Sequence, residues 1–429
     1  MQTAFRRDRL TWTAYVMIAF FCYLQVAPGQ IIGHLRDELG LSYSVGGLYV
    51  AAFAGGSMAA GLVSRRLESL LGRRRLLWSA SAVLSVGGVG LTAGTSAAAT
   101  IASVLVMGLA GGLLLVTIQA ALADHHGDHR TVALAEANVA ASMSYLALIG
   151  VLSLTAALGL GWRVALLASL VVPVVAWLSC RRVAIDAPPP SEQSQNRLPV
   201  MFWAAAAMLF CTGAAEWCIA AWGASFVEDV TGVSTDVAVA VMASYFLGVL
   251  GGRVLGSRLA RRHAPARLLA LALGVAGAGF FVLWPATTTA PAALGLLLLG
   301  IGLGNLFPMG LSLAVALAPA QASLASGRAV TATSAAILLA PFAVGALADA
   351  TSLKAALAVV PVALLLAAAG LALLHRARSA EAGGRTEPRQ SGRRPARRRV
   401  GSPERGPGAG TAAVQRGGHS GSGGPDHAP

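Results

Sequence analysis

The sequence predicts an all-α membrane protein in which twelve transmembrane helices form two similar halves, and three observations predict this fold class. Hydrophobic residues make up 56% of the 429 residues and charged residues only 12%, with a mean hydropathy of +0.68. This composition excludes a water-soluble globular protein. The apolar residues also fall into runs of about 20, the length that crosses a bilayer as a helix. Finally, the two halves of the chain match each other.

The apolar runs are separated by short segments rich in arginine, glycine, proline or aspartate. The predicted spans are residues 11–32, 45–64, 76–94, 98–123, 131–158, 163–180, 199–226, 237–259, 268–285, 290–318, 329–350 and 355–374. After a short N-terminal segment, residues 1–10, we expect one six-helix bundle at 11–180, a cytoplasmic linker at 181–198 and a second bundle at 199–374. The tail, 375–429, changes abruptly to Arg, Gly, Pro and Ser, so we expect it to be disordered.

The distribution of basic residues predicts the orientation. If the N-terminus is cytoplasmic, the inner segments carry 18 arginines before the tail, whereas the outer segments carry 3 basic residues. This asymmetry places both termini in the cytoplasm. The large excess of arginine over lysine suggests a GC-rich bacterial genome, and therefore a multi-pass protein of the plasma membrane.

The two halves align without a gap when the chain is shifted by 192 residues. Small apolar residues match often by chance in such a composition, but charged and polar matches at one offset do not. The matched pairs include Asp37 and Asp229, Gly40 and Gly232, Ser42 and Ser234, Arg66 and Arg258, Arg75 and Arg267, Gly108 and Gly300, and Ser142 and Ser334. Since each half has an even number of spans, the two halves are parallel repeats.

Two parallel six-span halves with a basic loop after the second span, echoed after the eighth, resemble the major facilitator superfamily of secondary transporters. The resemblance covers residues 10–375 and includes Gly61, the run Gly72-Arg73-Arg74 and the run Gly161-Trp162-Arg163. The acidic position of the family's loop motif is occupied here by Ser64 or Arg65. The resemblance implies alternating access, with spans one, four, seven and ten lining a central cavity.

Glu216 is the clearest ionisable group inside a span. A charged group at this depth costs about 2.5 to 3.5 kcal/mol on insertion scales, so it needs a reason. Its helical face carries Thr212, Gly213, Ala220 and Gly223, which leaves room for a neighbouring helix or an aqueous cavity. Burial disfavours the charged form of a carboxyl, so Glu216 is our candidate for proton or cation coupling. The alternative is a protonated structural carboxyl that bonds to a neighbouring helix.

A second group of residues is placed near the cavity by the resemblance. Asn305 lies in a glycine-rich run that ends at Pro308, where an interrupted helix can free backbone groups for a ligand or simply pack closely. Neither Glu216 nor Asn305 has a polar counterpart in the first half, which favours specialised roles. The predicted cavity residues are Tyr23, Gln25, Trp217, Asn305 and Phe307.

A cytoplasmic gate is a further hypothesis. Glu136 opens span five, and we expect it to pair with Arg253 or Arg258 of the second half, although ordinary interfacial charge is the alternative. The full predicted gate consists of Arg65, Arg66, Arg73, Arg74, Glu136, Arg253 and Arg258.

Other chemistry has little support in the sequence. The cluster from Asp124 to His129 lacks the spacing of a defined metal site, so we expect no bound metal. No P-loop is present, and no catalytic triad is visible, so we expect neither a cofactor nor an enzyme. The tail has no interleaved aromatic residues, which argues against nucleic acid binding. The four cysteines indicate buried thiols.

The sequence therefore predicts a monomeric secondary transporter of a small organic solute, driven by a proton gradient and leaning towards efflux. An uptake permease for a sugar or other metabolite is the alternative. A membrane sensor or scaffold that recruits partners through the basic tail is the second alternative.

Overall fold

The computed structural model describes residues 5–182, 198–259 and 262–384. It consists of one helical unit, residues 1–381, and a C-terminal unit, residues 382–429, of which all but the first three residues lie outside the described part. The described residues form twelve helical segments that are long and apolar enough to cross a membrane. The predicted fold class is thus confirmed. The tail beyond residue 384 and linker residues 183–197, on which two expectations fall, lie outside the described residues.

The first half contains six spans. The short helix α2 follows the first span, and the sixth span is broken into two helices. Its helices are α1 (Arg9–Gln30), α2 (Ile32–Leu39), α3 (Tyr43–Leu71), α4 (Arg73–Ala93), α5 (Ala97–His126), η1 (Gly127–His129), α6 (Arg130–Ala157), α7 (Gly161–Ser169) and α8 (Val171–Cys180). Together α7 and α8 make the sixth span.

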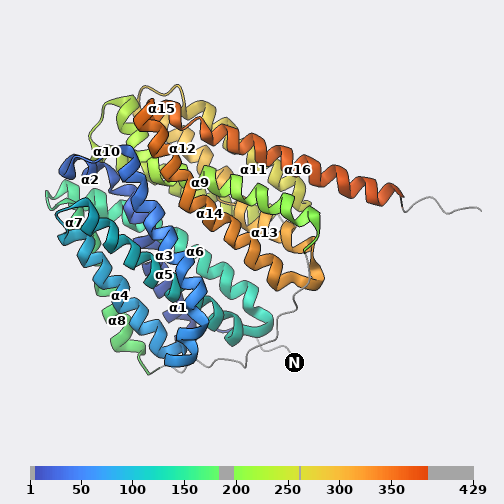
Figure 1. The fold of residues 1–429 in the computed structure, drawn as a ribbon, viewed down its shortest axis with the longest axis horizontal. Coiled ribbons are helices and arrows are strands. Elements are labelled where there is room, and N and C mark those ends of the chain that lie inside the picture. The colour runs from blue at the N-terminus through green and yellow to red at the C-terminus, as the bar shows by residue number, and fades with distance from the viewer. Residues whose placement is uncertain (1–4, 183–197, 260–261, 385–429) are drawn as a thin grey trace, which may run out of the picture. The chain divides into compact units, whose positions relative to one another are not determined.

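The second half repeats this arrangement. Its helices are α9 (Val200–Thr231), α10 (Thr235–Leu259), α11 (Pro265–Leu283), α12 (Thr289–Leu303), α13 (Leu306–Ala316), η2 (Pro319–Gln321), α14 (Ala322–Ala350), α15 (Leu353–Ala356) and α16 (Val359–Gly384). Figure 1 follows the chain through both halves, from blue at the N-terminus to red at α16.

The repeat seen in the sequence recurs in the helix boundaries. Helices α3, α4, α5, α6 and α7 begin at residues 43, 73, 97, 130 and 161, and α10, α11, α12, α14 and α15 each begin 192 residues later. The matched glycines explain part of this symmetry. A Cβ atom on Gly108 would come within 2.1 Å of the Phe53 carbonyl oxygen, and one on Gly300 would come equally close to that of Tyr245. In each half, the fourth span thus touches the backbone of the second span at a position that has room only for glycine.

The two halves contact each other mainly through α3 with α14, α6 with α10, and α1 with α9. We call the end of the bundles that carries Gly40 and Gly232 the outer end, following the charge asymmetry of the sequence, and the opposite end the inner end. Both glycines end a helix with a positive φ, 62° and 68°, which spares the backbone strain that a side chain would bring.

Several boundaries differ from the expected ones. Helix α3 continues to Leu71, so Arg65 and Arg66 lie on a helix and the connection to α4 is the single residue Gly72, with φ of 73°. Helix α16 runs to Gly384, past residue 374, because the intervening residues include good helix formers such as alanine, arginine and glutamate. All four cysteines are free thiols, but Cys180 and Cys211 are only half-buried.

Candidate functional site

Glu216 lies in the middle of α9 at the boundary between the two halves. Its side chain is half-buried among the surrounding helices. Neither carboxyl oxygen has a hydrogen-bond partner among the described residues, and the guanidinium of Arg253 on α10 interacts with it electrostatically. The sequence predicted a buried carboxyl here, and the structure adds its charged neighbour.

Five side chains interact around this position, and we call them the central cluster. They are Cys22 of α1, Tyr145 of α6, Glu216 of α9, and Tyr245 and Arg253 of α10. Cys22 and Tyr145 interact electrostatically, and the Tyr245 hydroxyl donates to the Glu216 backbone carbonyl at 3.3 Å. The cluster draws two helices from each half, so a relative movement of the halves must rearrange it.

Arg253 connects the two halves directly. Its Nη1 donates to the Ser142 hydroxyl at 2.6 Å and to the Asn138 carbonyl at 3.4 Å, both on α6. Its Nε donates to the Gly304 carbonyl at 3.3 Å. That carbonyl would bond to the residue four positions later in a continuous helix, but this residue is Pro308, which has no N–H. The break between α12 and α13 therefore frees an acceptor that holds Arg253 in place.

Aromatic rings of the two halves meet at the central cluster. The rings of Tyr145 and Phe246 lie 5.4 Å apart across α6 and α10, and Tyr245 and Phe246 lie 5.2 Å apart. Such contacts are in the range of favourable aromatic pairs.

The predicted cavity residues have different surroundings. The Tyr23 hydroxyl donates to the Ala165 carbonyl of α7 at 2.9 Å, which directs it into its own half. The Asn305 amide donates to the Gly252 carbonyl of α10, so it joins two helices of the second half. Gln25, Trp217 and Phe307 are half-buried.

Glu136 does not pair with the second half in this structure. It accepts two hydrogen bonds from Arg7, at 2.6 and 2.8 Å, and one from the Tyr15 hydroxyl at 3.0 Å, all within the first half. The expected partner Arg253 is instead held by Ser142, which lies deeper in the span. The expected pairing of Glu136 with Arg253 or Arg258 is thus absent among the described contacts of this structure, because Arg7 of the N-terminal segment already binds both carboxyl oxygens of Glu136.

Arg73 forms the densest charge contact of the inner end. It is 8% exposed and bonds to Glu68 at 2.6 Å and to Asp124 at 2.5 Å. Glu68 thus supplies, one turn later on α3, the acidic partner that positions 64 and 65 lack. Arg65, Arg66, Arg74 and Arg258 are exposed, and none of them has an ion pair with a described residue.

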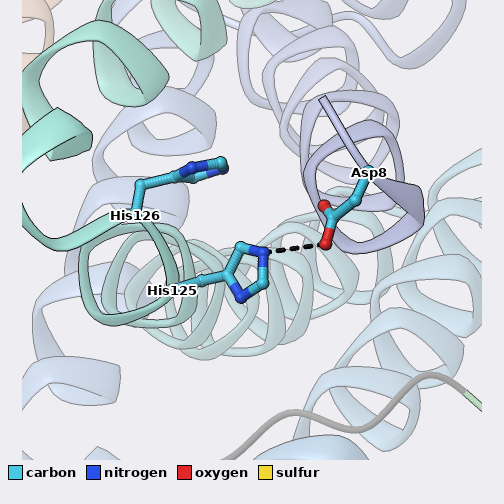
Figure 2. A group of neighbouring side chains, drawn as sticks. All are labelled: Asp8, His125 and His126. Carbon is cyan, nitrogen blue, oxygen red and sulfur yellow. Dashed lines mark ion pairs between the residues drawn. The ribbon is translucent and has the colours of Figure 1, made fainter. Parts of the chain in front are cut away.

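Asp8, His125 and His126 gather at the inner end of the first half (Figure 2), with their candidate ligand atoms within 4.8 Å of one another. Asp8 caps α1 by accepting from Thr11, and its other oxygen lies 2.7 Å from Nε2 of His125. Nε2 of His126 is 2.8 Å from the Thr11 hydroxyl. Burial acts to raise the pKa of Asp8, but the Thr11 hydrogen bonds and the neighbouring His125 lower it below its ordinary value. The Asp8–His125 ion pair and the hydrogen bonds of Thr11 thus give each of the three groups a partner within the protein.

The outer end holds the halves together through a set of contacts that we call the outer latch: Gln30, Tyr43, Ser44, Asp229 and Asp349. The Asp349 carboxylate of α14 accepts from the backbone N–H groups of Tyr43 and Ser44 at 2.7 and 2.8 Å, and so caps α3 of the other half. The Tyr43 hydroxyl donates to Asp229 at 3.0 Å, and the Gln30 amide donates to the Ala220 carbonyl at 2.7 Å.

Sequence reasoning missed the outer latch and most of the central cluster. Asp349 and Asp229 stand at the ends of spans, where an acid is unremarkable, while Tyr145 and Tyr245 are common interfacial residues. A usable signal was Arg253, whose counterpart at the repeat offset is Gly61, so this charge inside a span belongs to the second half alone.

Comparison with known proteins decides the family. The sequence model of the Major Facilitator Superfamily matches residues 11–327 and 205–413. The chain belongs to this superfamily. Its members are secondary transporters, and the two-bundle architecture with the central cluster at the boundary is therefore the fold of a transporter.

Solved structures of other superfamily members share this fold. A bacterial homolog of the human lysosomal transporter Spinster, in an inward-facing and unoccupied conformation, superposes with a TM-score of 0.70 at 13% identity, covering 86% of this chain and 97% of that one. The nucleoside transporter NupG gives a TM-score of 0.64 at 13% identity, covering 86% of this chain and 98% of that one. No curated protein sequence matches the chain. At such identities the likeness concerns the fold alone.

Proposed function

We propose that this transporter couples the movement of a proton to that of a small organic solute, with Glu216 as the group that takes up and releases the proton. The observation that supports the proposal best is the position of Glu216. It lies deep at the boundary between the halves, lacks a hydrogen-bond partner among the described residues, and interacts with an arginine that bonds to the opposite half. A carboxyl in this setting gains or loses a charge with a direct effect on how the halves are joined.

The proposed step is a change of partner by Arg253. While Glu216 is protonated, Arg253 keeps its hydrogen bonds to Ser142 and Asn138 of α6. Loss of the proton creates a carboxylate beside the guanidinium, and two opposite charges in contact attract by about 4 kcal/mol at an effective dielectric constant of 20. A hydrogen bond from a charged donor contributes about 1.5 to 3 kcal/mol net, so the new ion pair exceeds either bond to α6 alone and competes with the two together. Arg253 therefore turns towards Glu216, and α6 and α10 are freed to separate.

The solute is proposed to bind next to this pair. Tyr145 and Phe246 offer aromatic faces from both halves, so an organic solute with an apolar or planar part can contact both at once. A cationic group on the solute would compete with Arg253 for Glu216. We propose export as the direction, with uptake as the alternative, in a plasma membrane with both termini on the cytoplasmic side, and a monomer as the transporting unit.

The proposal is tested by solute exchange in proteoliposomes. Purified protein is reconstituted with a pH-sensitive dye inside the vesicles and exposed to a library of labelled organic solutes, nucleosides included, with and without an imposed pH gradient. The wild-type protein should accumulate a solute against its gradient only when the pH gradient is present. Glu216→Gln should still exchange solute at equilibrium but lose the gradient-driven accumulation.

The matched control is Glu228→Gln, which makes the same change on the same helix. Glu228 accepts a hydrogen bond from Thr235 at 2.8 Å near the outer end and is remote from Arg253 in sequence and position. Glu228→Gln should keep the pH-driven accumulation. If Glu216→Gln keeps the pH dependence of the wild type, Glu216 has no role in coupling.

A further inference from the structure

A basic pocket of about 460 Å³ lies at the inner end of the first half, between the start of α4 and the end of α8. Its lining consists of four arginines and two tryptophans: Arg74, Arg75, Trp78, Trp177, Arg181 and Arg182. It is separate from the central cluster, since neither α4 nor α8 contributes a residue to that cluster. The transport proposal assigns it no role.

The charge of this pocket is not balanced within the protein. None of the four arginines forms an ion pair with an acidic group among the described residues. Arg181 instead lies over the ring of Trp177, 4.9 Å from its centroid, which fixes its guanidinium at the rim. Two arginines at the start of α4 and two just after the end of α8 therefore face one open space. Four guanidinium groups at such spacing suit an anionic group with several oxygen acceptors.

The surroundings of the pocket identify the source of that anion. Above the arginines, the same two helices expose apolar side chains: Val86 is 68% exposed, Val174 57% and Leu178 61%. Such surfaces on a membrane-spanning helix face lipid tails. Trp78 and Trp177 line the pocket beside the arginines, and tryptophan is enriched where a membrane protein meets the headgroups. The ligand must therefore carry its anionic group at the interface and its apolar part inside the bilayer.

We propose that this pocket binds the headgroup of an anionic phospholipid, whose phosphate contacts the arginines of α4 and α8 and whose acyl chains lie against the valines and Leu178 above them. A bound lipid would join α4 to α8, two helices that otherwise touch each other only slightly, and would brace the first half against the bilayer while the halves move. Basic pockets between helices near the cytoplasmic surface are suited to such lipids.

The test is native mass spectrometry of the whole detergent-solubilised protein titrated with phosphatidylglycerol or cardiolipin, with phosphatidylcholine as the neutral lipid. The wild-type protein should retain at least one anionic lipid in preference to the neutral one. The triple variant Arg75→Gln, Arg181→Gln, Arg182→Gln should bind it more weakly, by roughly fivefold for each arginine and on the order of 100-fold in total. Thermal unfolding in the presence of each lipid checks that the variant is folded.

The matched control removes three exposed arginines elsewhere, with Arg262→Gln, Arg328→Gln and Arg376→Gln. It should bind the anionic lipid as the wild type does. Equal weakening in both triple variants would show an effect of net charge alone and overturn the proposal. The proposal is also overturned if millimolar inorganic phosphate stabilises the protein against thermal unfolding as much as the anionic lipid does, since the pocket would then bind a free anion.

Discussion

Removing the Asp349 carboxylate should open the outer end. Asp349 accepts from two of the first backbone N–H groups of α3, while Ser42 accepts from the third, at 3.3 Å from Val45. Loss of a helix cap costs about 0.5 to 2 kcal/mol. Because Asp349 is exposed and water can replace part of the contact, we take about 1 kcal/mol, which raises the population of the outer-open state about fivefold.

The assay is a distance measurement between spin labels at Thr95→Cys and Thr287→Cys, two exposed positions that correspond at the repeat offset and lie on opposite halves of the outer end. Asp349→Ala should increase the long-distance component about fivefold, and Asp349→Asn by less. The control Asp37→Ala removes the same charge from the outer end at a residue that makes no hydrogen bond or ion pair with a described residue. An unchanged distribution in Asp349→Ala, or an equal shift in Asp37→Ala, would refute this reasoning.

Three further predictions concern stability, measured by thermal unfolding in detergent. Gly108→Ala should destabilise the protein by about 1 to 3 kcal/mol because its Cβ meets the α3 backbone, whereas Gly150→Ala, which has open space, should change little. The Arg163 guanidinium beside Glu38 holds the pKa of that carboxyl below its usual value, so the stabilisation is present above the ordinary glutamate pKa and is lost as pH falls through the lowered one. Glu38→Gln should therefore cost about 1 kcal/mol at neutral pH and nothing in acid; an equal difference at both would contradict it. Arg73→Gln should destabilise far more than Arg74→Gln, since only Arg73 is buried with two carboxylates; similar losses would be inconsistent with the structure.

The spans and their repetition could be predicted from the sequence because both depend on local patterns. The thickness of the bilayer sets the length of an apolar run, and a duplicated chain repeats its helix starts and its close glycine contacts. The depth of Glu216 followed in the same way, since its place within one apolar run is a local property. The fold class therefore needed no knowledge of tertiary contacts.

The partners of the site residues could not be predicted in this way. Glu136 was expected to meet Arg253, but Arg7, 129 residues away in sequence, occupies it. Arg253 was assigned to a gate by its charge alone, while its position depends on Ser142 and on the carbonyl that Pro308 leaves free. Such contacts join residues far apart in the chain, and spacing along one helix carries no information about them.

The central claim is that the protonation of Glu216 controls how the two halves tilt. The most direct measurement follows label distances at both ends as a function of pH, using Thr95→Cys with Thr287→Cys at the outer end and Ser69→Cys with His263→Cys at the inner end. In the wild type, raising the pH should change the two distances in opposite directions, and Glu216→Gln should hold both at their low-pH values. Distances that change together, or that respond to pH equally in Glu216→Gln, would contradict the claim.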